Sequence, residues 1–129
     1  MTLPEQYLTE IKTKLMASLA VDSITVVKER TLVEQGYFRA RLTLSNGDFL
    51  EVVEYFVVKN GSCVTESYRH QWMDQTQQVL KKRWDNVEHF PNLPNFPHHV
   101  HVGDEFNVEP SQSISILELI GIIEQELGV

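Results

Sequence analysis

Two Asn-Gly dipeptides, Asn46-Gly47 and Asn60-Gly61, separate three segments that are rich in β-branched and aromatic residues. Asn-Gly between such segments is the strongest short-range signal for a β-hairpin, because both residues accept positive φ angles. Segments of the same character precede and follow these three. The sequence therefore predicts a five-stranded antiparallel meander, with strands at residues 23–30, 37–45, 49–59, 62–73 and 78–84.

A helix is predicted at each end, over Pro4–Ala20 and over residues 113–127. Each begins with a capping-box pattern, in which a Ser or Thr precedes a Glu by three positions: Thr2 with Glu5, and Ser115 with Glu118, although Ser113 could also cap the second helix. In each helix the apolar residues recur every three or four positions and form one face: Leu8, Ile11, Leu15 and Leu19 in the first, and Ile116, Leu119, Ile120, Ile123 and Leu127 in the second. The predicted fold is α+β, with both helices packed on the sheet and a His/Pro-rich loop crossing to the last helix.

The chain of 129 residues suits a single domain, residues 1–129, and one cysteine allows no internal disulfide. No apolar run is long enough to span a membrane, and the N-terminus lacks a signal-peptide pattern, so we expect a cytoplasmic protein without a membrane partner. The net charge of −7 argues against a general nucleic-acid binder. A nucleic-acid role would need a local basic patch, or a larger assembly that brings the substrate close.

Two-residue turns at both Asn-Gly dipeptides would fix which side chains face each other. The second turn would place Glu51 opposite His70 and Val53 opposite Tyr68, so that a carboxylate–imidazole pair lies within a core face. This pair could be a satisfied polar couple, or the carboxylate could orient the imidazole for acid–base chemistry.

The first turn would place Arg39 opposite Glu54, on the other face of the sheet. That face would also carry Arg41 and Arg69. The cluster could be a solvated surface with cross-strand ion pairs, or a small platform for anions or phosphates, which the planar guanidinium suits.

Residues 83–105 hold four of the five histidines and three of the five prolines. Three explanations are open. The first is a metal site, since His99, His101 and Glu105 follow the HxHxxxE ligand string of cupins, although the flanking glycines and the second cupin motif are missing. The second is metal-independent proton chemistry on a phosphodiester, for which this segment and its neighbours supply Tyr68, His70, Arg83, Asp85, His89, His99 and His101. The third is packing, with histidines bracing a proline-rich loop.

Four stretches, in this order, resemble the TumE family: "GYFRARLTLSNGDFLEVVEY", "SYRHQW", "RWDNVEH" and "FPHHVHVGDE". The resemblance runs from about Tyr7 to the C-terminal helix. Family members often have a small residue and a proline after the asparagine, and a second histidine after the first. This chain instead reads Val87, Glu88, His89 and Phe90, which keeps His89 but removes its neighbour.

The resemblance implies the toxin of a type II toxin–antitoxin pair, neutralised by a helix-turn-helix antitoxin. It also points to a functional set: Glu54, Tyr68, His70, Asp85, Asn86, His89, His99 and His101. We therefore favour a metal-independent endoribonuclease without a cofactor, acting on RNA. His101 or His99 would be the general base, His89 or His70 the general acid and Arg83 the phosphate-steadying cation, with Asp85 orienting an imidazole.

Two other classes stay open: a non-catalytic binding module or target-binding toxin, and a small metal-binding protein. An exposed edge at the first strand would favour a homodimer formed by sheet pairing. The ribonuclease hypothesis makes a geometric prediction, namely that His89, His99 and His101 converge near His70 while His98 points away. It further predicts that Asp85 or Glu51 contacts one of these rings.

Overall fold

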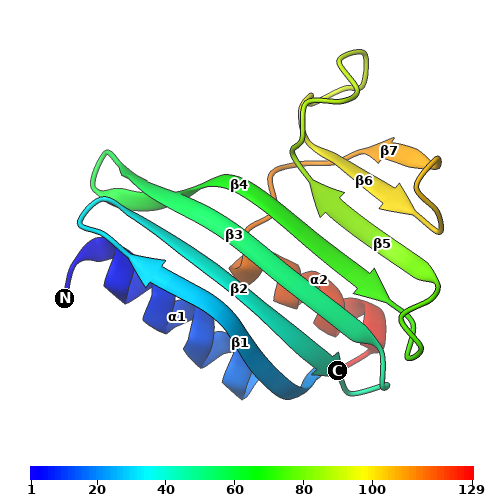
Figure 1. The fold of residues 1–129 in the computed structure, drawn as a ribbon, viewed down its shortest axis with the longest axis horizontal. Coiled ribbons are helices and arrows are strands. Elements are labelled where there is room, and N and C mark those ends of the chain that lie inside the picture. Colours follow the sequence, from blue (N-terminus) through cyan, green and yellow to red (C-terminus); the bar gives the residue numbers. More distant parts are fainter.

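The computed structural model describes residues 1–129 and has two layers, a twisted antiparallel sheet and two helices on one of its faces (Figure 1). Each strand pairs with the next along the chain, in the order β1 to β7. The elements are α1 (Leu3–Ala17), β1 (Val21–Thr31), β2 (Gln35–Leu44), β3 (Phe49–Lys59), β4 (Ser62–Met73), β5 (Leu80–Asp85), β6 (His99–Val102), β7 (Val108–Pro110) and α2 (Ile116–Leu127). The predicted α+β class is confirmed.

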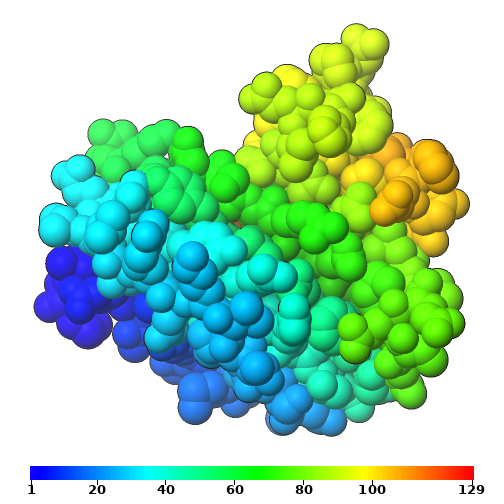
Figure 2. All heavy atoms as spheres, in the orientation of Figure 1, coloured from blue at the N-terminus to red at the C-terminus, as the bar shows by residue number.

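The sheet has seven strands rather than the predicted five. The two additional strands, β6 and β7, come from the segment that was expected to be a crossing loop. β6 pairs with β5, and β7 pairs with β6. Both strands are too short to show the alternation by which a strand is recognised in sequence. Residues 86–98, between β5 and β6, are the part that stays a loop, and Figure 2 shows them projecting from the body of the molecule.

The predicted capping boxes are both present, and each closes with the expected reciprocal hydrogen bonds. α1 ends at Ala17, three residues earlier than predicted, so Leu19 lies beyond the helix and is 78% exposed. The other members of its predicted stripe face the sheet, with Ile11 and Leu15 fully buried. No helix is long and apolar enough to cross a membrane.

The β2–β3 connection differs from the predicted two-residue turn. The Leu44 N–H donates to the Asp48 carbonyl over 2.8 Å, so the loop has three residues, with Gly47 at a φ of 89°. Three-residue hairpin loops place a left-handed residue at this position. The register shifts by one residue, and Arg41 faces Glu51 rather than Val52. A shift of one residue exchanges the two faces of a strand, so Glu54 is buried on the core face.

The β3–β4 hairpin begins as predicted, with Lys59 opposite Ser62 and Val57 opposite Val64. A β-bulge then interrupts the pairing, because Tyr55 faces Ser67 while Phe56 faces Thr65. The bulge leaves Glu66 as an extra residue on β4. Beyond it, Glu51 faces Gln71 and Glu54 faces Tyr68, so the predicted pairs of Glu51 with His70 and of Val53 with Tyr68 are wrong.

The sheet consequently has two chemically different faces. The helix-covered face packs the apolar core, including Phe38, Leu50, Phe56 and the buried residues of α2. The helix-free face carries the alternate residues, such as Arg41, Glu51 and Gln71. In Figure 1 the helices lie behind the sheet, so the viewer looks onto the helix-free face.

Candidate functional site

Three polar side chains meet where β5 and β6 pair. Asp85, the last residue of β5, faces His99, and Arg83 faces His101. The His99 Nε2 atom lies 3.0 Å from Asp85 Oδ1, and the His101 Nε2 atom lies 3.6 Å from Asp85 Oδ2. All three side chains are at least 94% buried. The predicted contact between Asp85 and an imidazole is confirmed, and so is the convergence of His99 and His101.

Backbone carbonyls orient both imidazoles. His99 Nδ1 lies 2.9 Å from the Pro97 carbonyl, and His101 Nδ1 lies 2.9 Å from the Glu105 carbonyl. A carbonyl oxygen only accepts hydrogen bonds, so each Nδ1 carries the proton and each Nε2 is left to face Asp85. A neutral imidazole presents a lone pair at Nε2. The cluster is therefore built to hold a proton or another cation between the two rings and the carboxylate.

Burial lowers the pKa of His101 below its usual value, and the nearby Arg83 guanidinium lowers it further. The hydrogen bond to the Glu105 carbonyl and the charge of Asp85 act in the opposite direction but are outweighed. His101 is therefore neutral near neutral pH. A neutral imidazole can accept a proton from a substrate.

Arg83 supplies a positive charge at the rim of the cluster. Its Nε atom lies 3.6 Å from Asp85 Oδ2 and its Nη1 atom lies 3.5 Å from Glu105 Oε1. The Nε atom is buried and has no hydrogen-bond partner. The side chain also lines a cavity of about 460 Å³ between the β4–β5 end of the sheet and residues 103–106. Arg83 thus connects the buried cluster with an open cavity that could admit an anion.

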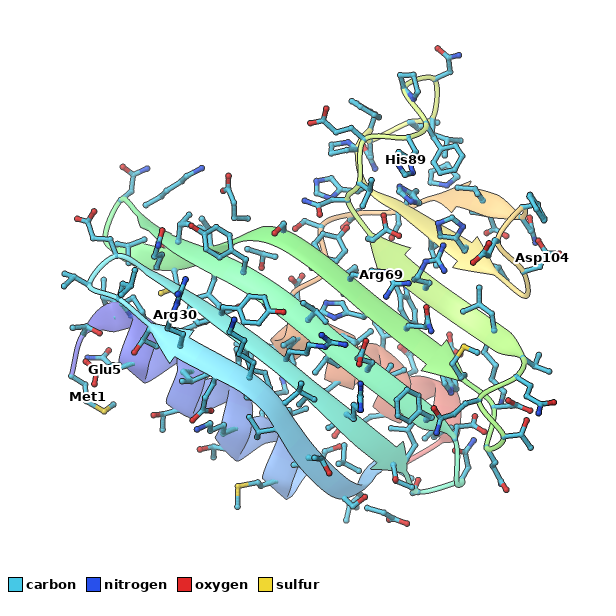
Figure 3. The ribbon with its side chains drawn as sticks, in the orientation of Figure 1. Met1, Glu5, Arg30, Arg69, His89 and Asp104 are labelled. Carbon is cyan, nitrogen blue, oxygen red and sulfur yellow. The ribbon has the colours of Figure 1, made fainter.

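One side chain of the loop of residues 86–98, Phe90, packs against the cluster. The ring of Phe90 meets His99 edge-on with 4.9 Å between ring centroids, and it meets His101 at 6.0 Å. His89 is exposed on the same loop and contacts Phe90 rather than the cluster (Figure 3). The Phe90 ring therefore covers part of both imidazoles. Sequence reasoning missed Phe90, although its place between Asp85 and His99 in the chain was a usable signal.

The structure does not bring His70 to the cluster. Its Nε2 atom bonds the Ile114 carbonyl over 2.9 Å, and its Nδ1 atom accepts from the Val53 N–H over 3.3 Å. His70 is fully buried on the helix-covered face, and burial lowers its pKa to about 4. The predicted convergence of His70 with the other histidines is wrong, because His70 pairs with the buried Trp84 on the helix-covered face, whereas Asp85 pairs with Arg69 on the helix-free face.

The supporting residues of the sequence-based set hold structural positions. The Tyr68 hydroxyl contacts His98 Nδ1 at 2.9 Å and donates to the Gln112 carbonyl at 3.1 Å. His98 thus points away from the cluster, as predicted. The Asn86 side chain accepts from the Tyr68 N–H and donates to the Glu66 carbonyl, which extends the β4–β5 pairing past the bulge.

Glu54 forms a buried connection among three elements on the helix-covered face. Its carboxylate accepts from the Tyr7 hydroxyl over 2.6 Å, from Thr65 over 3.0 Å and from the Ile116 N–H over 2.7 Å. Burial raises the pKa of Glu54 despite these bonds. The predicted position of Glu54 among the arginines is wrong, because the longer β2–β3 loop turns it into the core.

Glu51 takes the place that Glu54 was expected to hold. Its Oε2 atom bonds Arg39 Nη2 and Arg41 Nε, each over 3.2 Å. Arg69 donates to the Gln71 side chain on the same face. The predicted arginine cluster therefore forms on the helix-free face, with Glu51 as its carboxylate.

Asp85, His99 and His101 offer three ligand atoms within 4.8 Å of one another, the kind of set that binds transition metals. This set differs from the predicted one, since the Glu105 carboxylate contacts Arg83 and only its backbone carbonyl reaches a histidine, His101. The arrangement could hold a metal, or it could move protons beside a phosphate held by Arg83. Both uses depend on the same carbonyl-oriented imidazoles.

A comparison with family models matches residues 9–127 to the family described as toxin TumE. The matched part includes all seven strands and the whole Arg83–Asp85–His99–His101 cluster. Searches of curated proteins and of solved structures found no match. The match extends over nearly the entire chain, and the chain therefore belongs to the TumE toxin family.

Proposed function

We propose that the chain is the toxin of a toxin–antitoxin pair and that it cleaves RNA with Arg83, Asp85, His99 and His101. The observation that carries the proposal is the convergence of two carbonyl-oriented Nε2 atoms on one buried carboxylate, with a guanidinium beside it. This combination provides proton acceptors, a proton donor and a cation within one small site. Those are the groups that phosphodiester cleavage needs when no metal takes part.

In the proposed reaction, neutral His101 takes the proton of a ribose 2′-hydroxyl. The 2′-oxygen attacks the adjacent phosphorus, and the bond from phosphorus to the 5′-oxygen breaks. The departing 5′-oxygen takes a proton from His99, where Asp85 Oδ1 lies 3.0 Å from Nε2 and is placed to hold that proton. The products are a 2′,3′-cyclic phosphate and a 5′-hydroxyl. Arg83 steadies the charge that develops on the phosphate oxygens.

The partner that silences this activity would be an antitoxin of the helix-turn-helix class, as the family resemblance implies. An antitoxin that keeps Phe90 packed over the two imidazoles would block the site without touching the reacting atoms. This role is consistent with the burial of the cluster in the isolated chain.

The test is induction of the toxin without an antitoxin, with growth and RNA integrity followed over time. We expect growth arrest and RNA fragments with 2′,3′-cyclic phosphate ends from the wild type. His99→Asn and His101→Asn should abolish both effects. His98→Asn is the matched control, because this neighbour bonds Tyr68 outside the cluster.

Intact RNA in growth-arrested wild-type cells would refute the nuclease while sparing the toxin. A toxin that acts by binding a target would then be favoured, and the net charge of −7 is compatible with such a protein.

A second candidate is metal binding by Asp85, His99 and His101, because their ligand atoms lie within 4.8 Å of one another. The charge of Arg83 beside Asp85 opposes it, since a divalent ion would compete with the guanidinium for the same carboxylate.

A further inference from the structure

All five arginines of this acidic chain lie on the helix-free face of the sheet. We propose that this face binds the phosphate backbone of single-stranded RNA and leads the strand to the Asp85–His99–His101 cluster. This surface would serve the proposed ribonuclease function, and it depends on that function only for what happens to the RNA after binding. It names a surface that lies mostly outside the catalytic cluster.

The strand register places these side chains in rows that cross the sheet. Directly opposed residues lie on the same face. One row runs from Arg41 on β2 through Glu51 and Gln71 to Arg83 on β5 and His101 on β6. Neighbouring strands lie about 4.8 Å apart, so Arg41 and Arg83 mark a line of about 14 Å across four strands.

A second row runs from Arg69 through Asp85 to His99, and a third runs from Arg30 through Tyr37 to Tyr55. Arg39 lies between the first and third rows, opposite Lys28. Figure 3 labels Arg30 and Arg69 on this face, over β1 and β4. The cations therefore extend from the first strand of the sheet to the cluster at β5 and β6.

Three carboxylates on this face each lie beside an arginine. Glu51 bonds Arg39 and Arg41, while Asp85 and Glu105 lie near Arg83. Such ion pairs keep the guanidinium groups close to the surface of the sheet. Each guanidinium has five N–H groups, so some remain available to donate to phosphate oxygens. Arg30, Arg41 and Arg69 are exposed.

The opposite layer of the molecule has the opposite character. Both helices have their acidic capping residues there, and α2 adds further carboxylates near its end: Glu5, Glu118, Glu124 and Glu126. The charge of −7 thus belongs mainly to other surfaces, and the arginines form the local basic patch that an acidic nucleic-acid binder needs.

Aromatic groups on the same face suit unpaired bases. Phe106 is 95% exposed at the edge of the cavity that Arg83 lines. Tyr37 lies under the Lys28 ammonium, 5.9 Å from the ring centroid, and faces Tyr55. Single-stranded RNA is recognised by aromatic rings that stack on bases beside cations that contact the backbone, whereas duplex RNA offers no unstacked bases. The expected ligand is therefore single-stranded RNA rather than duplex RNA.

The experiment measures binding of a fluorescent oligouridylate by anisotropy, with cleavage blocked by His101→Asn in every sample. The test variant is Arg30→Gln, Arg41→Gln and Arg69→Gln combined. The control replaces three lysines of the helical side with glutamine: Lys12, Lys14 and Lys82. Both triple variants lose three positive charges, so both carry a net charge of −10 instead of −7. Circular dichroism and thermal unfolding verify that all variants are folded.

We expect the arginine variant to lose at least about ten-fold in affinity and to reduce the salt dependence of binding by about 2 in log–log slope, whereas the lysine control changes little. Equal weakening in both variants would mean that net charge alone acts, and would overturn the inference. No binding by the His101→Asn protein would overturn it as well. A loss of antitoxin binding by the arginine variant with unchanged RNA binding would assign the face to the antitoxin instead. Arginine-dependent RNA binding by a toxin that cuts no RNA would support the surface while refuting the proposed reaction.

Discussion

The Nε2 atom of His99 lies 3.0 Å from the Oδ1 atom of Asp85, and the pairing of β5 with β6 holds the two residues opposite each other. The other carboxylate oxygen of Asp85 is 3.6 Å from both Arg83 Nε and His101 Nε2. One buried carboxylate therefore faces three basic groups. Because these groups are buried, removing the charge of Asp85 would affect both the chemistry of the site and the stability of the fold.

Asp85→Asn keeps the size of the side chain but removes the negative charge that lies beside Arg83 and faces the Nε2 atoms of His99 and His101. We expect RNA cleavage and toxicity to be lost, and the chain to unfold more easily by about 1–3 kcal/mol, because buried basic groups lose their partner. Urea unfolding and a cleavage assay measure the two effects. Asp22→Asn, on the exposed part of β1, is the control that should change neither. Full activity of Asp85→Asn would remove Asp85 from the site.

Phe90→Ala should uncover the two imidazoles of the cluster, since the Phe90 ring packs edge-on against both. We expect diethyl pyrocarbonate to modify His99 and His101 several-fold faster in this variant, as located by peptide mass spectrometry. Phe96→Ala removes another partly exposed phenylalanine of the same loop and should leave these rates unchanged. Equal rates in Phe90→Ala and wild type would show that Phe90 does not control access.

Removal of metal ions should leave RNA cleavage intact, because Arg83 already supplies the cation beside Asp85. Protein purified without a histidine tag should contain well below one equivalent of transition metal by elemental analysis, and a chelator should not slow cleavage. One tightly held equivalent that disappears in Asp85→Asn would instead assign these ligands to a metal site.

His70 should make the fold sensitive to mild acid. Its pKa is lowered from 6.5 to about 4 by burial, so the folded state keeps it neutral while the unfolded chain protonates it first. The stabilisation is therefore fully present above about pH 6.5 and is lost as the pH falls towards 4, by roughly 3 kcal/mol in all. Urea unfolding across this range should show a shallower loss for His70→Gln than for wild type. His89→Gln, at an exposed position, should keep the wild-type slope.

Gly36→Ala should destabilise the fold although alanine suits a strand better than glycine does. A Cβ atom at this position would lie 2.4 Å from Cε2 of Phe56, a fully buried ring in the core. Overpacking of this kind costs about 1–3 kcal/mol. Gly121→Ala, in α2 with nothing within 4 Å of the added atom, should instead stabilise by about 0.5–1 kcal/mol. Thermal unfolding of the two variants should therefore shift in opposite directions.

The parts of the fold that depend on neighbours in sequence could be predicted. The capping boxes of Thr2 with Glu5 and of Ser115 with Glu118 involve residues three apart, and both form. The turn at Asn60-Gly61 likewise depends on the φ preferences of two residues, and it starts the hairpin in the predicted register. Local geometry was enough in each case, because the interacting groups are held together by a few covalent bonds.

The faces of the sheet could not be derived in this way. The three-residue loop that contains Gly47 and the bulge at Glu66 each shift the register by one residue, so Glu54 is buried and Glu51 lies among the arginines. Which residue is buried depends on the whole core, since Glu54 bonds Tyr7 of α1, Thr65 of β4 and Ile116 of α2. A turn dipeptide contains no information about such distant partners.

The sequence by itself determined the α+β class, the two capped helices and the presence of imidazoles in residues 83–105. Only the tertiary structure decided that Asp85, and not Glu51, is the carboxylate beside His99 and His101, and that His70 and His89 lie apart from them. The physical reason is the pairing of β5 with the four-residue strand β6, whose partner is selected by hydrogen bonds and packing along the whole sheet edge. A strand of four residues is too short to show a periodic pattern in the sequence. Its pairing partner, and therefore the set of residues beside His99 and His101, is known only from the folded sheet.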